Sequence, residues 1–515
     1  MKTYTSTKDV FGHPRGLLYL FFAELWERFS FYGMRALLVL YMTKQLLFSD
    51  KMSFGIYAAY MSLVYVTPLI GGMLADAILG FRKAIILGGV LMALGHFFLT
   101  FETPLFFYSS LAFIIIGNGF FKPNISSFVG ALYEDNDTRR DSGFTIFYMG
   151  INIGGALAPL LCAWLAEAFG WHYGFILAGI GMLIGLLVFR KGMQKNIFED
   201  HGLIPNELRY NEKKFGIKYG NLIIIGALLA VPIFALIIKF YQFEHYLISI
   251  VTFFLILYLI NILKKVTKNE RKKLLAALYF TTLYTLFSAI FEQAGSSLTL
   301  FADRAVNLIG LNAAQTNSLN SGFIILLAIP FSLLWSYLSR NNRNPNSVIK
   351  FGAGLFFLGL GFVIFGMSAN QANEFAKTPM FYLILGTFVY TIGELCLSPI
   401  GLSKITELSP IKYSSFIMGV WFSANFFGHF FAGKIANLTT INLGEPSVFS
   451  KGVFGSITEL ITGLSPNILV TQSEDFQQLF SYVSVYANFG IISILLGITV
   501  ILISNPIKKM MQNVH

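Results

Sequence analysis

The 515-residue chain is 55% hydrophobic and only 12% charged, and a soluble globular protein carries about twice that charged fraction. Apolar runs recur along its whole length and leave no long polar block for a separate catalytic domain, so an all-α polytopic membrane protein is predicted. The two cysteines, Cys162 and Cys396, lie in apolar segments without metal or redox spacing, which excludes cysteine chemistry from the expected function.

Fourteen apolar segments are predicted to span the membrane. In chain order they occupy residues 15–47, 53–80, 82–101, 105–133, 140–168, 171–191, 218–240, 244–265, 271–303, 315–338, 346–369, 376–408, 412–437 and 479–504. The first segment carries charges and continues past Leu40 without a small-residue cleavage site. It is therefore interpreted as a retained helix and not as a signal peptide.

The basic residues gather on one side of this predicted topology. When alternate connections are assigned to alternate sides, one side receives the linker at 190–218, the connection at 264–273 and both chain ends. The other side receives few basic residues, such as Lys44 and Arg304. The positive-inside rule then predicts that both termini are cytoplasmic, in a plasma membrane or bacterial inner membrane. The net charge of +11 is thus a topology signal, and no nucleic-acid partner is expected.

The predicted helices fall into three parts. Residues 1–191 form a six-helix bundle, 192–270 form a cytoplasmic linker with two inserted helices, and 271–515 form a second six-helix bundle. The inserted pair is expected to pack at the periphery, and the polar connection at about 438–478 is expected to be a flexible outer loop. Two six-helix halves are the layout of major facilitator transporters. The segment GMLADAILGFRK at 72–83 resembles a loop motif of that superfamily.

The first predicted helix carries four formal charges, Glu24, Glu27, Arg28 and Arg35. At about 100° per residue these side chains and Tyr32 share one face of the helix, within an arc of roughly 140°. An unpaired charge near the bilayer centre costs roughly 2.5–3.5 kcal/mol, so this face is expected to meet partner charges, water or a ligand. The structural alternative is a static ion-pair cluster that only locks the helix to its neighbours.

Short motifs occur in both halves of the chain. They are ELWERFSFYG at 24–33, GNGFFKPN at 117–124, FTIFYMGINIG at 144–154, FEQ at 291–293, GELCLSPIGLS at 393–403 and MGVWF at 418–422. Together they resemble the proton-coupled oligopeptide transporter family, also called the POT or peptide-transporter (PTR) family, within the major facilitator superfamily. Two inserted helices are typical of its bacterial members. Phe31 stands where Tyr is common in that family, which should alter side-chain preference more than the activity.

The resemblance implies which charges couple transport to protons. Lys122, an isolated cation before a proline, is expected to pair with Glu24 or Glu27, and separating the partners changes the proton affinity of the carboxylate. Glu292 is expected to pair with Arg35 or Arg28 across the two halves and thereby to close the extracellular side. Proton coupling is assigned to Glu24, Glu27, Lys122 and Glu292, and gating to Arg35 and Glu292. Which carboxylate carries the proton stays open.

A short peptide carries an ammonium and a carboxylate at opposite ends, and the predicted pocket has groups for both. The arginine fork suits a carboxylate, and Glu394 suits an ammonium. Asn152 and Asn320 are expected to bind amides or the peptide ends, while aromatic residues supply adaptable apolar surface. The predicted substrate-binding set is Arg28, Arg35, Tyr32, Tyr65, Lys122, Asn152, Tyr148, Asn320, Glu394 and Trp421.

These expectations describe a proton-coupled symporter that imports di- and tripeptides by alternating access and functions as a monomer in the bilayer. The sequence has no phosphate loop, metal-ligand spacing or nucleophile–base set, so no enzyme activity, metal or cofactor is expected. The nearest alternative is a transporter of another small anion or zwitterion, such as nitrate or a modified amino acid. A lipid-modifying enzyme and a passive channel are the more distant ones. His96 and His429 are interpreted as packing residues.

Overall fold

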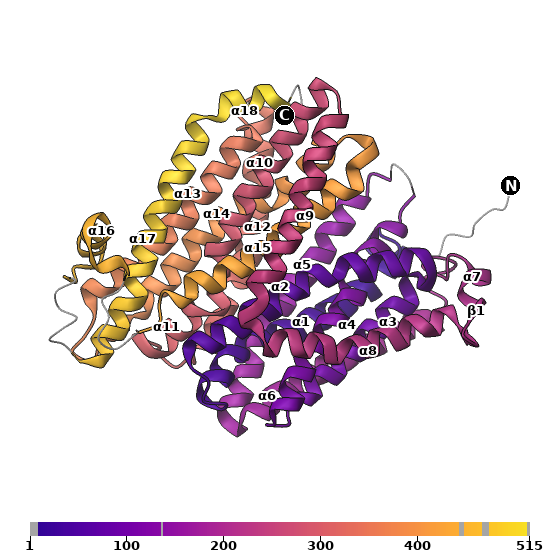
Figure 1. Ribbon diagram of the computed structural model, residues 1–515, viewed down its shortest axis with the longest axis horizontal. Coiled ribbons are helices and arrows are strands. Elements are labelled where there is room, and N and C mark those ends of the chain that lie inside the picture. The colour runs from indigo at the N-terminus through magenta and orange to yellow at the C-terminus, as the bar shows by residue number, and fades with distance from the viewer. Residues whose placement is uncertain (1–8, 135–136, 442–447, 466–472, 512–515) are drawn as a thin grey trace. The chain divides into compact units, whose positions relative to one another are not determined.

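The computed structural model describes residues 9–134, 137–441, 448–465 and 473–511, and nearly all of them are helical (Figure 1). The long helices are α1 (Arg15–Lys44), α2 (Asp50–Leu74), α3 (Gly80–Phe98), α4 (Pro104–Ala131), α5 (Arg140–Phe169), α6 (Trp171–Gln194), α8 (Tyr219–Lys239), α9 (Glu244–Lys265), α10 (Lys268–Phe291), α12 (Ser318–Arg340), α13 (Ser347–Met367), α14 (Met380–Leu408), α15 (Ser414–Asn437) and α17 (Glu474–Leu502). The short helices are α7 (Glu207–Asn211), α11 (Ser297–Ala305), α16 (Gly452–Thr462) and α18 (Ser504–Met511). Strands β1 (Lys213–Lys214) and β2 (Ile217–Lys218) form an antiparallel hairpin, and β3 (Val306–Asn307) pairs in parallel with β4 (Thr378–Pro379).

Each predicted span overlaps a long helix, which confirms the all-α polytopic fold. Within the described ranges, eleven helical stretches are long and apolar enough to cross a membrane. The helix α1 is not among them because its charges interrupt the apolar run, and α2 and α3 form one stretch through a π-helical turn, Ala75–Leu79. In an apolar medium a helix satisfies its own backbone groups, which explains why these sequences adopt it. The count of fourteen spans stays a prediction.

Two segments differ from the prediction: one predicted span and one predicted loop. The span predicted at 271–303 is broken, since α10 ends at Phe291 and a 3-10 turn, Glu292–Gly295, separates it from α11. The connection at 438–478, expected to be a flexible loop, contains the eleven-residue helix α16, so that expectation was wrong for this part. Gly463 ends α16 in the left-handed conformation, at φ +67°, which glycine adopts without steric cost. Residues 442–447 and 466–472 of this connection lie outside the described residues.

The loop motif at 72–83 connects α3 to the linker that follows α6. Gly80 has φ +72°, and a side chain there would collide with the backbone of Leu203. The guanidinium of Arg82 donates to the carbonyl of His201 at 2.7 Å and to that of Glu199. Asp76, in the π-helical turn, is exposed. The motif therefore fixes the linker against the end of α3.

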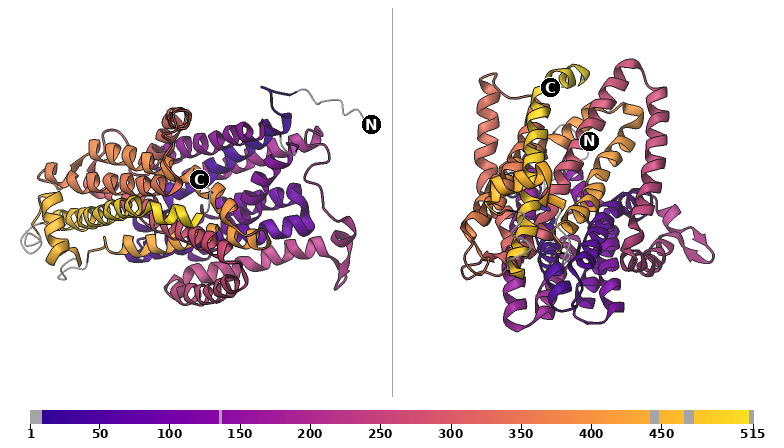
Figure 2. Two further views of the ribbon diagram at one scale, coloured as in Figure 1. Left: turned by 90° about the horizontal axis from the view of Figure 1, so that it is seen from above. Right: turned by 60° about the vertical axis from the view of Figure 1, so that its left-hand side comes forward.

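The chain forms two compact units. The first comprises the described residues of 1–41 and 63–240, and the second those of 42–62 and 241–515. Small residues allow close helix contact in both, as in lipid-embedded bundles: Gly88 of α3 lies against the backbone of Gly117 in α4, and Gly359 of α13 against Gly490 in α17. The contact of α13 with the yellow helix α17 is visible in both sets of views (Figures 1 and 2).

The inserted helix pair is divided between the units. The first unit includes α8, which packs against α4, and the second includes α9. The three-part division at 191 and 270 stays a prediction.

Candidate functional site

The predicted charges of α1 are buried in the first unit. Glu24, Glu27 and Arg28 are 1%, 0% and 2% exposed. The guanidinium of Arg28 binds Glu27 with a fork: Nη2 donates to Oε1 at 2.6 Å, and Nε donates to the other carboxylate oxygen. The same Nε lies 3.3 Å from Glu24 Oε1. One guanidinium thus contacts two carboxylates, and two of its hydrogen bonds go to Glu27.

The helix α4 contributes the other polar side chains of this cluster. Asn118 accepts from Arg28 Nη2 at 3.3 Å and donates to the carbonyl of Val64 in α2 at 3.1 Å. Lys122, one turn further along α4, has its Nζ 4.7 Å from the ring centroid of Tyr65 and acts electrostatically on Glu24. The cluster therefore combines two carboxylates with two cations, and neutral Asn118 connects it to the backbone of α2.

The two carboxylates differ in their hydrogen bonds. Both oxygens of Glu27 accept from Arg28, whereas Glu24 Oε2 is buried and has no hydrogen-bond partner among the described residues. An ionised oxygen without a donor is costly in an apolar interior, and a proton on it removes that cost. The geometry thus separates a carboxylate bound by arginine from one suited to hold a proton.

Further predicted residues of the first unit lie along α1 and α5. The Arg35 guanidinium lies 5.9 Å from the ring centroid of Tyr32, and that of Arg28 lies 5.2 Å from the ring of Phe31. In α5, the buried Asn152 donates from Nδ2 to the carbonyl of Tyr148 at 3.0 Å. This bond orients the Asn152 amide nitrogen towards its own helix. The side-chain oxygen of Asn152 can still accept a hydrogen bond from another group.

A second polar cluster lies in the second unit, between α12 and α14. Asn320 Nδ2 donates to Glu394 Oε2 at 2.9 Å and to Thr391 Oγ1 at 3.1 Å. Within the described residues no lysine or arginine forms an ion pair with Glu394, and the charge of Glu292 acts on it with the same sign. Glu394 is therefore an acid held by a neutral amide.

Glu292 lies in the 3-10 turn between α10 and α11 and is buried. Its Oε1 is 3.7 Å from Nε2 of His429 in α15. Arg35 belongs to the first unit and Glu292 to the second, and their pairing stays a prediction.

Trp421 is buried by aromatic packing in the second unit. It stacks on Tyr284 of α10 with ring centroids 4.7 Å apart, and the absence of a side chain at Gly401 makes room for it. Because its indole is covered in this way, contact between Trp421 and a substrate stays a prediction.

Ion pairs also connect the segment 42–62 to α11. Asp50 accepts from both terminal nitrogens of Arg304, at 2.5 and 2.8 Å. Lys44 Nζ lies 2.5 Å from Asp303. Sequence reasoning placed Lys44 and Arg304 on the outer side but did not identify these acidic partners.

Sequence reasoning also missed Asn118 and Thr391, and it interpreted His429 as a packing residue. A signal existed for Asn118, which stands four residues before Lys122 and so on the same face of one helix. The same holds for Thr391, three residues before Glu394. For His429 no sequence signal pointed to Glu292, which is far away in the chain.

Among the described residues, no group of three or more His, Cys, Asp or Glu side chains is placed to hold a metal ion.

Comparison with known proteins gives a consistent result. A sequence profile of the POT family matches residues 82–447. A peptide transporter from Yersinia enterocolitica is 37% identical over 468 residues, covering 84% of this chain and 90% of its own. A di-/tripeptide transporter from Lactococcus lactis is 33% identical over 536 residues, covering 99% and 98%. An uncharacterized transporter from Bacillus subtilis is 35% identical over 521 residues, covering 98% and 97%.

Solved structures are similar over nearly the whole chain. A crystal structure of a mutant peptide transporter POT with alafosfalin has a TM-score of 0.80 at 31% identity, covering 99% of this chain and 98% of the other. A POT family transporter with 5-aminolevulinic acid has a TM-score of 0.77 at 30% identity, covering 97% and 98%. A tetrameric transporter, PepTSo2, has a TM-score of 0.78 at 25% identity, covering 96% and 99%.

Proposed function

This chain belongs to the POT family, and from that premise we propose that it is a proton-coupled symporter that imports di- and tripeptides by alternating access. The relatives named peptide transporter and di-/tripeptide transporter support this proposal, because each matches the chain over most of its length. The observation that carries it is the pair of polar clusters inside apolar helices, one with arginine and lysine and the other with an amide-held acid.

The substrate end groups are assigned by charge. Glu394 is proposed to bind the peptide ammonium, and Arg35 and Lys122 its carboxylate. The fork of Arg28 is occupied by Glu27, so Arg28 reaches a substrate carboxylate by giving up part of that contact. Weakening the bond of Arg28 to its acid therefore favours substrate binding, which is one physical route to coupling.

The proton is assigned to Glu24. Its Oε2 has no donor among the described residues, whereas both oxygens of Glu27 have one. Glu27 then acts as the partner of Arg28, and Lys122 acts on the charge of Glu24. The pair of Arg35 and Glu292 is proposed as the outer gate, with His429 as a further neighbour of Glu292.

Reconstituted protein tests the coupling. Glu24→Gln and Lys122→Ala are expected to abolish uphill uptake of labelled dialanine driven by a pH gradient. Exchange of dialanine across the membrane should persist in Glu24→Gln, because Glu24 is assigned to the proton and not to the substrate. Glu459→Gln, at an exposed site in α16, is the matched control. Normal concentrative uptake by both variants would contradict the coupling, and loss of uptake in the control would show that the assay reports on folding.

A second candidate is transport of another small zwitterion. The structure of a POT family transporter with 5-aminolevulinic acid favours it, since that ligand also carries an ammonium and a carboxylate. A competition assay with labelled dialanine distinguishes the two candidates. If peptides are the main substrates, unlabelled dialanine should inhibit uptake at a lower concentration than 5-aminolevulinic acid does.

The proposed location is the bacterial inner membrane, with both termini in the cytoplasm. The support is the predicted distribution of basic residues; the terminal residues 1–8 and 512–515 lie outside the described residues. The functional unit is proposed to be the monomer, although one relative has been solved as a tetramer. No cofactor is proposed, since the proton gradient drives the cycle.

A further inference from the structure

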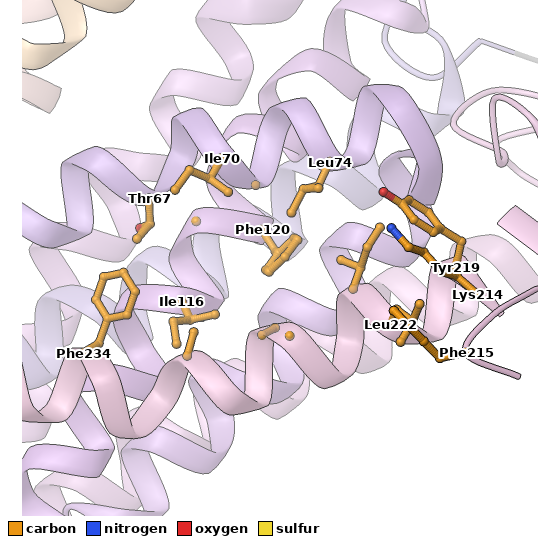
Figure 3. A pocket seen from close by; sticks show the side chains of 16 residues that line it. Thr67, Ile70, Leu74, Ile116, Phe120, Lys214, Phe215, Tyr219, Leu222 and Phe234 are labelled. Carbon is orange, nitrogen blue, oxygen red and sulfur yellow. The ribbon is translucent and has the colours of Figure 1, made fainter. Parts of the chain in front are cut away.

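An apolar groove of about 430 Å³ runs along α8, between this helix and the helices α2 and α4 (Figure 3). All of its walls belong to the first unit. The lining residues named below come from α2, α4, α8 and the β1–β2 hairpin. Its volume falls within the roughly 300–1,000 Å³ of clefts that bind small molecules.

Small residues on α8 create the groove. Ala227 and Val231 of α8 pack in a buried cluster with Ile116 and Phe120 of α4, and Ala227 also lines the groove. On the groove side, a side chain built at Gly226 would meet no atom within 4 Å. The helix is therefore held along one edge and stands away from α2 along the other.

The length of the groove offers almost no polar group. The hydroxyl of Thr67, in the wall from α2, donates to the carbonyls of Leu63 and Ile115, at 3.2 and 2.9 Å. Ile70, Leu74 and Phe120 are among the apolar residues that line it (Figure 3). A ligand for this surface must be a hydrocarbon.

One end of the groove is different. Lys214 and Tyr219 line this end, and Phe234 lies at the opposite end (Figure 3). The Lys214 nitrogen lies 5.9 Å from the ring centroid of Phe215. Lys213 and Lys218 face each other in the same hairpin. In the sequence around the hairpin, residues 207–219, the acids are Glu207 and Glu212, and Arg209 and three lysines outnumber them.

The dimensions and charge indicate the orientation of the ligand. Tyr219 and Phe234 are fifteen residues apart on α8, which is about 22 Å of helix and exceeds half of a hydrocarbon core of about 30 Å. By the positive-inside rule the lysine-rich end lies at the cytoplasmic surface, where anionic lipids gather. Phe215, 87% exposed at the tip of the hairpin, is an aromatic residue suited to that interface.

We propose that this groove binds an anionic phospholipid, with one acyl chain between α8, α2 and α4 and the phosphate at Lys214 and the Tyr219 hydroxyl. The lysine ammonium and the phenol both donate to phosphate oxygens, and a zwitterionic choline headgroup brings a cation to an already basic opening. The lipid holds α8 to α2 where the protein itself leaves a gap. This binding does not depend on which substrate is transported.

Native mass spectrometry of the full-length protein in detergent tests the proposal with dioleoylphosphatidylglycerol, dioleoylphosphatidylcholine and oleate as probes. The wild type is expected to retain dioleoylphosphatidylglycerol in preference to dioleoylphosphatidylcholine. Lys214→Gln should reduce that retention about fivefold, as expected for one lysine near an anionic lipid. Gly226→Leu should remove the retained lipid by filling the groove. Lys451→Gln and Gly322→Leu are matched controls, because Lys451 is exposed far from the groove in sequence and a side chain at Gly322 also meets no atom within 4 Å.

Distinct outcomes overturn the proposal. Equal retention of both phospholipids, or unchanged retention in Lys214→Gln, removes the role of the anionic headgroup. Unchanged retention in Gly226→Leu places the lipid elsewhere, and complete displacement by oleate identifies a free fatty acid as the occupant. Lys214 is on an exposed hairpin, so its variant tests the site even if Gly226→Leu lowers the thermal transition.

Discussion

The polar clusters of the two units solve the problem of buried charge in different ways. In the first unit, Glu24, Glu27, Arg28 and Lys122 balance each other, and one guanidinium is shared between two carboxylates. In the second unit, Glu394 is held by the amide of Asn320 without an ion-pair partner among the described residues. The first cluster is neutral and can exchange partners. In the second cluster, a neutral amide is the hydrogen-bond donor to the acid.

We propose that this difference gives the two clusters separate tasks. A carboxylate that shares its cation changes its affinity for protons whenever the cation is drawn away, which suits coupling. A carboxylate held by a neutral donor attracts a cation without first releasing one, which suits capture of an ammonium. The predictions below test this division, from the largest expected effect to the smallest.

The largest effect is expected from Arg28→Ala. It leaves two buried carboxylates without their arginine partner, and removing one partner of a buried ion pair costs about 3–5 kcal/mol. Thermal unfolding in detergent should show a markedly lower transition, and dialanine uptake should be lost. Arg343→Ala, at an exposed position, is the control. An unchanged thermal unfolding transition in Arg28→Ala would show that Glu24 and Glu27 do not need Arg28 to compensate their charge.

Glu394→Gln is expected to affect binding more than folding, because Asn320 can donate to an amide oxygen as it does to the carboxylate. Loss of a hydrogen bond to a charged group costs about 1.5–3 kcal/mol. The concentration of unlabelled dialanine that halves the uptake of labelled dialanine should therefore rise roughly ten- to a hundredfold.

The matched control for Glu394→Gln is Glu407→Gln, on the same helix but exposed. N-acetyl-dialanine, which has no ammonium, should lose far less affinity than dialanine. Equal losses for both peptides would remove the ammonium role of Glu394.

Asn118→Ala tests how far the first cluster depends on its neutral member. The variant removes the contact with Arg28 and leaves the Val64 carbonyl without its side-chain donor, which should cost about 1–3 kcal/mol. The expected result is a moderately lower thermal transition and a shifted dependence of uptake on pH. Ser110→Ala, on the same helix, removes only a bond to the carbonyl of Phe107 and should leave that profile unchanged.

The smallest effect is expected in the loop between α4 and α5. Hydrogen bonds from the side chain and backbone of Arg139 lower the pKa of Asp137 from 3.8 to about 2. A lowered pKa means that the pairing stabilises the fold above the ordinary value and is lost only as the pH falls from about 4 towards 2. Asp137 does not change its charge between about pH 5 and 8, because its pKa lies below that range. The pH dependence of uptake by Asp137→Asn should therefore match that of the wild type in this range. A flattened profile would assign proton sensing to this loop.

Several features followed from the sequence because they depend on local chemistry. Apolar runs predicted the helices, since a chain in lipid satisfies its backbone groups within each segment. Helical spacing placed Glu24, Arg28 and Arg35 on one face of α1, and the family motifs indicated the transporter family. These inferences needed only periodicity, hydropathy and residue order.

Other features depend on which helices approach each other, and the tertiary structure decided them. Asn118 of α4 completes the cluster around Arg28, and His429 of α15 lies beside Glu292. The groove along α8 exists because small residues of that helix face a gap beside α2, although hydropathy alone marks α8 as an ordinary span. Sequence thus determined that buried charges had to find partners. Only the packing of distant helices determined which partners, because that choice depends on distances between segments that the order of residues does not specify.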